Sequence, residues 1–411
     1  MTADLDARRA EGASVFASLP TPTEKLEHWK YVDLGFDPEA LTAPASPEAP
    51  MGPDAVVEAL VDASARITVV DGAVVDLSVA AEGIDVVRFA DVDDGLAPSL
   101  AVALAAGMSP DRDRLSAASL AHATDGVLVR IHRGVELAAP VVVDVQAVAT
   151  DVVTYPHVAV RVDDLARGAV VVVYRSPDGF RAVVPRLDIS VGDGAGIDIT
   201  TVQTWGGETR ATAYERLVLG RDTSARIGEV GLGAALGRLD LRVDLEGDGS
   251  SVDLDGLSFG DGDQTLDYRV VMRHAGRNTS SNVFLKGAVE DRASSVFTGL
   301  LRIEEDATRT SAFETNRNLV LSDDARAQSV PNLEILCDDV VCGHGSSVGQ
   351  LEEEPLYYLM SRGLPRDHAE RVMVHGFFEE ILDELPSTQV RGPVRDAVNA
   401  KYEAAQAEGR V

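Results

Sequence analysis

Three potential metal ligands lie close together near the C-terminal end of the sequence. Cys337, Cys342 and His344 fall within the stretch CDDVVCGHGSSVGQ, and the sequence has no other cysteine. Thiolate sulfur and imidazole nitrogen suit iron, zinc or copper. In an extended strand, Cys337 and Cys342 would be about 16 Å apart and would face opposite sides. That separation argues against a disulfide, which needs Cα atoms within about 7 Å.

Cys342 and His344 are two residues apart and would share one face of a strand. Two ligands do not complete a tetrahedral site, so the others must come from elsewhere in the chain or from another subunit. Gly343 and Gly345 would leave room for a second backbone or an inorganic group to approach the histidine. The alternative is a cysteine that packs as a small hydrophobe beside a hydrogen-bonded histidine. Spacing alone leaves both interpretations open for this pair, and it favours packing for Cys337.

Motifs of several common chemistries are absent from the sequence. A P-loop needs a lysine in a Gly-Lys-Ser/Thr setting, and none of the four lysines stands in one: Lys25, Lys30, Lys286 and Lys401. The sequence contains no HExxH motif. The acidic stretch GDGDQTLD lacks the twelve-residue calcium loop and its closing glutamate. We therefore expect this chain to bind no nucleotide.

The charge of the chain is strongly negative, with 67 Asp and Glu against 37 Lys and Arg and a formal net charge of −30. The acids are dispersed, which favours a solvated, salt-adapted surface over a specific cation-binding one. Such acidity argues against nucleic-acid binding, which needs a basic surface. The N-terminal stretch has no apolar region of a signal peptide, and no apolar run approaches the roughly 18–20 residues that span a bilayer. We expect a cytoplasmic protein without membrane association.

Three regions follow one another along the chain. Residues 1–124 are expected to mix helices with a short β-hairpin, which forms an N-terminal α/β region. Within it, TPTEKLEHWKYVDL predicts a helix in which Thr21 caps, Pro22 takes the first position and Glu24 completes a capping box. The proline- and alanine-rich stretch LTAPASPEAPMGPDA indicates a linker.

Residues 125–348 carry a β pattern. Short segments with alternating apolar residues are separated by Gly, Asp and Asn turns over more than 200 residues. This is too long for one ordinary sandwich and favours a mainly β fold built as a stacked solenoid, such as a parallel β-helix. The repeat period is loose, so a large sandwich or barrel stays open.

Residues 349–411 are expected to be helical. A first helix runs to Gly363, a C-cap glycine, and a last helix begins at Pro393. Between them Pro365 opens an amphipathic helix whose apolar stripe is Ala369, Val372, Met373, Gly376, Phe377 and Ile381. These helices would cap the open end of a solenoid, bind a partner, or do both.

The segment LEILCDDVVCGHGSSVGQLEEEPLYYLMSRGL resembles the C-terminal signature of the SufB/SufD family, the scaffold subunits of the SUF iron–sulfur cluster assembly machinery. PTPTEKLEHWKYVDL is similar to the family's N-terminal Trp-Lys-Tyr motif, and TDGVLVRIHRGVELAAPVVV to the start of its β core. SufB proteins typically carry Glu-His-Glu where this chain has Gly343-His344-Gly345, and an additional upstream cysteine ligand. This sequence has neither feature, which places it on the SufD side.

This resemblance implies a right-handed parallel β-helix flanked by an N-terminal α/β region and C-terminal helices. It implies pairing with a SufB-like subunit through the β-helix ends, and a homodimer is possible when the chain is alone. A nascent iron–sulfur cluster would form at the SufB–SufD interface, with His344 as a ligand and Cys342 in the same interface. The C-terminal helices, mainly residues 366–385 and the loop at Arg362-Gly363, would dock a SufC-like ATPase. The chain itself would be a scaffold and not an enzyme.

Two other functions stay open. Some β-helices are polysaccharide lyases or hydrolases, but those show acidic pairs with basic residues on the side wall and usually a secretion signal. A self-contained metal-binding protein could use Cys342 and His344 with nearby acids such as Asp338 or Asp339. Stoichiometric metal retained by the lone chain would distinguish this last case.

Overall fold

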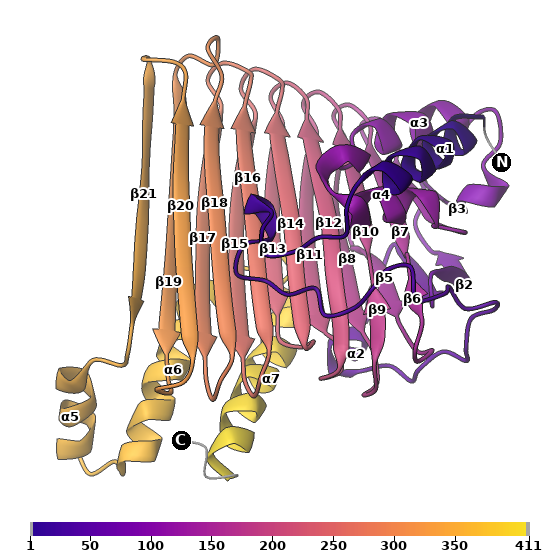
Figure 1. Cartoon of the computed structure of the whole chain (residues 1–411). Coiled ribbons are helices and arrows are strands. Elements are labelled where there is room, and N and C mark those ends of the chain that lie inside the picture. Colours follow the sequence, from indigo (N-terminus) through magenta and orange to yellow (C-terminus); the bar gives the residue numbers. More distant parts are fainter. Residues whose placement is uncertain (1–2, 408–411) are drawn as a thin grey trace.

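Two long β-sheets face each other in the computed structural model, which describes residues 3–407. One sheet has ten strands and the other eleven. In Figure 1 the two sheets overlap in the view, and helices lie at both ends. In chain order the strands are β1 (Ala65–Val70), β2 (Ala73–Val79), β3 (Ile84–Arg88), β4 (Val127–Ile131), β5 (Val141–Gln146), β6 (Val153–Thr154), β7 (His157–Val162), β8 (Arg167–Arg175), β9 (Arg181–Val183), β10 (Arg186–Val191), β11 (Gly196–Thr204), β12 (Thr209–Leu219), β13 (Ser224–Gly231), β14 (Leu236–Leu245), β15 (Ser251–Gly260), β16 (Thr265–His274), β17 (Ser280–Val289), β18 (Ser294–Ile303), β19 (Thr310–Val320), β20 (Arg326–Ile335) and β21 (Val340–Gly349).

From β10 onward, consecutive strands alternate between the two sheets, and neighbours within each sheet are parallel. Each pair of strands therefore makes one turn of a solenoid. The predicted mainly β architecture, a parallel solenoid with helices at both ends, is confirmed, and a sandwich or barrel is excluded.

One corner of the solenoid repeats a single backbone conformation. A residue with positive φ recurs there every 27 to 31 residues, and its N–H bonds to a carbonyl of the next turn: Leu165, Gly194, Asp222, Gly249, Asn278 and Arg309. The left-handed conformation suits Gly, Asn and Asp, which explains the turn residues seen in the sequence. The unequal turn lengths explain why the repeat period looked loose.

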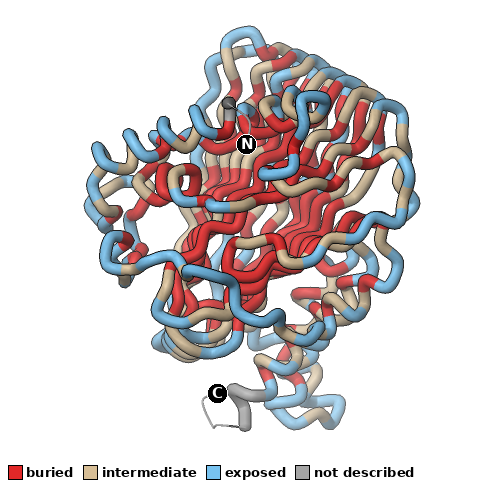
Figure 2. Tube along the Cα trace, turned by 90° about the vertical axis from the view of Figure 1, so that its right-hand side faces the viewer, coloured by how far each residue is buried: buried red, intermediate tan, exposed pale blue. Residues whose placement is uncertain are grey.

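Apolar side chains from both sheets fill the interior. Alternate residues of each strand point inward and form one continuous aliphatic core, which Figure 2 shows as buried tube running through the molecule. The β1–β2 pair is the predicted antiparallel hairpin, and it extends one sheet of the solenoid through β5. The helices that lie before the core or follow it are α1 (Ala3–Ser18), α2 (Ala55–Ala59), α3 (Ala97–Ala105), α4 (Arg114–Ala121), α5 (Glu353–Ser361), α6 (Arg366–Leu382) and α7 (Thr388–Ala407).

The helix predicted to begin at Thr21 is wrong. Only a short 3-10 turn forms there, at Glu27–Trp29, and Tyr31 has a positive φ of 73° that no helix continues. The cause is tertiary, because the indole of Trp29 is fully buried and its Nε1 donates to Asp113 at 3.0 Å. The Arg238 guanidinium lies 4.1 Å from the centroid of the same ring. Docking of one side chain overrides the local capping signals.

Helices α2, α6 and α7 cover the outer face of the ten-stranded sheet. The predicted apolar stripe of α6 is partly wrong, because Val372 is 50% exposed, whereas Val374 and Phe378 are buried against the sheet. Apolar residues surround much of this helix, so more than one face could have been chosen. The last helix begins at Thr388 and not at Pro393. Pro393 is the sixth residue of α7 and lies inside the helix, where it leaves the carbonyl of Gln389 without its i→i−4 hydrogen bond.

Two of the four lysines form hydrogen bonds that connect α6 and α7 to the solenoid. Lys286 of β17 is 3% exposed; its Nζ donates to the carbonyl of Phe377 at 2.7 Å and pairs with Glu380 of α6. Lys401 of α7 donates to the carbonyl of Leu232 at 2.6 Å. Both helices are therefore held by partly buried charge-assisted hydrogen bonds as well as by apolar packing.

We expect Lys286→Met to loosen α6 specifically. The change removes the hydrogen bond to the Phe377 carbonyl and should destabilise the docked α6 by about 1–3 kcal/mol. Amide hydrogen exchange in α6 should become faster and measures this effect. Lys25→Met, at an exposed position, is the matched control. Unchanged exchange across Arg366–Leu382 in the Lys286 variant would show that apolar packing alone holds the helix.

Candidate functional site

The last turn of the solenoid leaves both sheets open. Within residues 3–407, strand β20 pairs only with β18, and β21 only with β19, so each presents ten residues of unpaired edge. Figure 1 shows β21 as the outermost strand at this end. Uncovered strand edges are templates for pairing with another chain.

Cys342 and His344 lie on β21 and face the solenoid interior. In the parallel register Cys342 is paired with Ala312 and His344 with Glu314, both of which are buried on β19. Neighbouring strands in register point their side chains the same way, so the prediction that Cys342 and His344 share a face is confirmed. Cys342 is half-buried against the core, whereas His344 is exposed because no further turn covers it.

Cys337 does not lie on either strand. It falls in the turn between β20 and β21, where the backbone N–H of Leu336 donates to the carbonyl of Ile303. Cys337 and Cys342 both pack against the same core, and both are free thiols. The prediction that they face opposite sides is wrong, because the chain bends between them and does not continue as one strand. The prediction that they form no disulfide is confirmed.

Gly343 and Gly345 lie on the outward face of β21, beside Phe313 and Thr315. A Cβ at Gly343 would come no closer than 3.6 Å to the Phe313 ring, and one at Gly345 would reach only Thr315 at 4.0 Å. Neither has a positive φ. The space beside His344 is open, as expected, but on the outer surface of the strand.

The sequence interpretation missed a polar wall beneath this strand. The inward residues of β19 include Glu314, Asn316 and Asn318, all buried, and Asn318 donates to Asn316. Burial raises the pKa of Glu314 to about 8. The alternation in the sequence does place these three polar residues on one face of a strand. Polar residues at alternate positions ordinarily indicate a face that points to solvent, so the sequence pattern suggested the wrong side.

Exposed apolar side chains surround the open end. They are Ile335 and Leu336, at the end of β20, and Val341 and Val348, on β21. Among the described residues, no group of three or more His, Cys, Asp or Glu side chains is arranged to hold a metal ion. An incomplete donor set thus lies inside an uncovered, partly apolar end.

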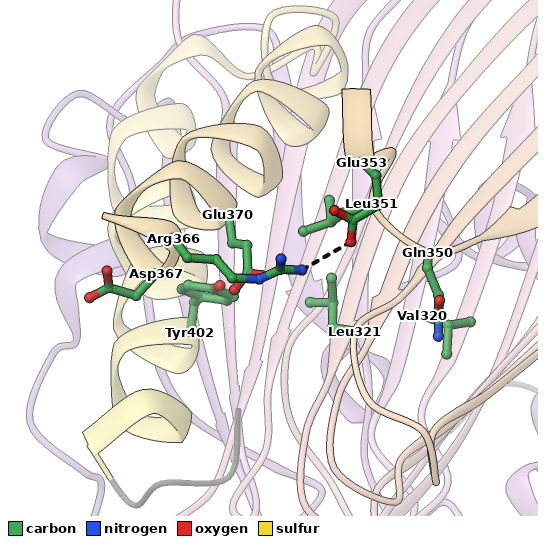
Figure 3. A pocket seen from close by; sticks show the side chains of 9 residues that line it. All are labelled: Val320, Leu321, Gln350, Leu351, Glu353, Arg366, Asp367, Glu370 and Tyr402. Atoms are coloured by element: carbon green, nitrogen blue, oxygen red, sulfur yellow. Dashed lines mark hydrogen bonds and ion pairs between the residues drawn. The ribbon is translucent and has the colours of Figure 1, made fainter. Parts of the chain in front are cut away.

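A second surface feature lies where the C-terminal helices leave the solenoid. A cavity of about 650 Å³ lies between the ends of β19 and β21 and helices α5, α6 and α7, and Figure 3 shows Arg366 reaching across it to Glu353. Arg366 also pairs with Glu370 within α6, and its pair with Glu353 ties α5 to α6. On α5, Tyr357 and Tyr358 are exposed.

These features define a class of protein: a parallel β-solenoid with an unfinished thiol and imidazole site at its open end. Residues 145–377 match the sequence family described as SUF system FeS cluster assembly, SufBD core domain. The chain therefore belongs to the SufBD family of iron–sulfur cluster assembly proteins, as its motifs predicted.

Individual relatives agree with this assignment. The chain is 35% identical over 299 residues to an iron–sulfur cluster assembly SufBD family protein of Mycobacterium tuberculosis H37Rv, covering 71% of this chain and 75% of that one. It is 29% identical over 378 residues to the iron–sulfur cluster assembly protein SufD of Escherichia coli K12, covering 89% and 85%. With SufD of Bacillus subtilis 168 it shares 28% over 304 residues, covering 72% and 68%. Within the described residues, no helix is long and apolar enough to cross a membrane.

Proposed function

We propose that this chain is the SufD-like scaffold subunit of a cytoplasmic iron–sulfur cluster assembly complex. A nascent cluster, as cargo, would be built between its last solenoid turn and a SufB-like partner. The observation that carries this proposal is the pair of donors, Cys342 and His344, facing inward on an uncovered strand with too few ligands beside them. A partner must supply the remaining ligands.

The geometry of the open end supports pairing through the sheets. Strands β20 and β21 can each accept one more parallel or antiparallel neighbour by main-chain hydrogen bonds, and the apolar residues around them would be buried by the same contact. A second copy of this chain offers the same edges, so a homodimer is the expected state without the partner. Pairing would close the end and remove His344 from bulk water.

The C-terminal helices support docking of a SufC-like ATPase. Tyr357, Tyr358 and Val372 are exposed on α5 and α6, and exposed aromatic clusters are typical of interfaces. Nucleotide hydrolysis in the docked subunit would shift these helices. That shift would change the equilibrium between an open and a covered solenoid end, and so couple the docking surface to the cluster site. This chain would bind no nucleotide and catalyse no reaction alone.

We further propose that residues 1–124, 125–348 and 349–411 are its three structural units.

The direct test is anaerobic reconstitution with ferrous iron and sulfide. The chain alone and the chain with its SufB-like and SufC-like partners are compared by cluster absorbance and iron content. We expect a cluster in the complex only, and a loss of at least about tenfold in iron affinity for His344→Ala, with a smaller loss for Cys342→Ala.

His132→Ala is the control, since His132 is a half-exposed histidine directly after β4, paired with Asp85 and away from both the open end and the C-terminal helices. Equal iron retention by the lone chain would favour the self-contained metal-binding alternative. Equal retention by the His344 variant in the complex would remove this histidine from the ligand set.

A further inference from the structure

The column of inward-facing residues beneath His344 changes from aliphatic to acidic. Residues in register along the ten-stranded sheet are neighbours from turn to turn, and this column is Ile199, Ile227, Leu254, Val283, Glu314 and His344. Four aliphatic residues are followed by a carboxylic acid, directly beneath the histidine. Glu314 is therefore the one position below His344 at which this column departs from its aliphatic pattern.

Glu314 lies in the core without a partner. It is 2% exposed, and neither carboxyl oxygen has a hydrogen-bond partner among the described residues. A buried polar group left unsatisfied destabilises the fold, whereas an aliphatic residue would continue the column. Packing therefore gives no reason for a glutamate at this position.

The solenoid also makes room for this carboxyl group. Its oxygens lie over Gly299 of β18, on the opposite wall, and a Cβ at Gly299 would be 2.0 Å from Oε2. The glycine leaves a niche that the carboxyl occupies while the end of the solenoid is open. Adjacent strands are only about 4.8 Å apart, so a change of rotamer would bring the carboxyl beside the His344 ring.

We propose that Glu314 is a positioning residue for His344: when a partner covers the open end, its carboxylate accepts the hydrogen bond from the ring N–H that faces away from the iron. A metal-bound histidine ordinarily has such an acceptor on its other nitrogen, which fixes the ring and makes it a better ligand. The inference rests on the proposed function, because it requires His344 to bind the cluster's iron.

Two substitutions separate positioning from packing. Glu314→Met keeps a flexible chain of similar length in the niche but removes the acceptor. Glu314→Gln keeps an oxygen that can accept the same hydrogen bond. In the complex reconstituted with ferrous iron and sulfide, a ferrous chelator is titrated and the retained iron is measured, together with the melting temperature of each variant chain.

The expected result is a 10- to 100-fold loss of iron affinity for Glu314→Met with an unchanged or higher melting temperature. Glu314→Gln should retain most of the affinity. Glu215→Met, at another buried glutamate of the core on β12, should leave iron retention unchanged.

Wild-type iron retention by Glu314→Met, or an equal loss in Glu215→Met, would overturn the inference. If His344→Ala loses iron while Glu314→Met does not, the inference alone fails. If His344→Ala loses nothing, the ligand assignment fails, and the role of Glu314 fails with it.

Discussion

Replacement of Trp29 by alanine should lower the free energy of unfolding by about 3–5 kcal/mol, the range for truncating a fully buried large aromatic residue. Trp29 joins the N-terminal segment to the rest of the fold through two contacts. Its indole donates to Asp113, which caps α4 by accepting from Ser116 N–H and also accepts from Tyr214 of β12. The Arg238 side chain of β14 packs on the ring. Loss of the ring leaves a cavity and an unpaired carboxylate oxygen together.

Urea denaturation followed by circular dichroism measures this effect. Trp29→Phe should cost less, about 1–3 kcal/mol, because it keeps most of the apolar volume and loses the hydrogen bond. Lys30→Ala, at the exposed neighbouring position, should stay within about 0.5 kcal/mol of the original chain. If the Trp29 variants unfold at the same urea concentration as this control, the N-terminal segment is not part of the cooperative fold.

Stability should fall steeply as the pH rises from about 5 to 8, because a carboxylic acid pair lies inside the solenoid. Glu215 of β12 and Glu229 of β13 meet across the core, and Thr201 donates to Glu229. Burial raises the pKa of Glu215 to about 8. The pKa of Glu229 lies well above its ordinary value, through burial and then through the nearby charge of Glu215.

The direction follows from proton binding. Between the ordinary glutamate pKa of 4.5 and about 8, the folded chain keeps a proton that the unfolded chain releases. The free energy of unfolding therefore decreases as pH rises through this window. A shift of about three pKa units corresponds to a loss on the order of 3–5 kcal/mol.

The double variant Glu215→Gln/Glu229→Gln isolates this contribution. Other raised acids, such as Glu314 and Asp255, and the large net negative charge act in both proteins and cancel in the difference. The variant should gain stability relative to the original chain at pH 8 but not at pH 5, as measured by denaturation at both values. Parallel pH profiles for the two proteins would mean that the pair is not the source of the dependence.

Several features of this molecule were accessible from the sequence because they depend on neighbouring residues. Alternating apolar residues between Gly, Asp and Asn turns indicated the solenoid, since strand geometry and left-handed turns are local properties. Gly363 ends α5 as predicted, with a positive φ of 96°. The motif around His344 indicated the family, and its spacing to Cys342 indicated a shared face.

Other features depend on contacts between distant residues, and only the tertiary structure decided them. A period of two tells which residues of β19 share a face but not which face is inside; stacking of turns 27 to 31 residues apart placed Glu314 inward and Phe313 outward. The same holds for Trp29, whose partners Asp113 and Arg238 are far away in the sequence. Because these contacts bury the indole, the segment forms a short 3-10 turn instead of the predicted helix. Strand alternation is set within a few residues, whereas the buried face is set by the register between turns, and that register brought Glu314 beneath His344.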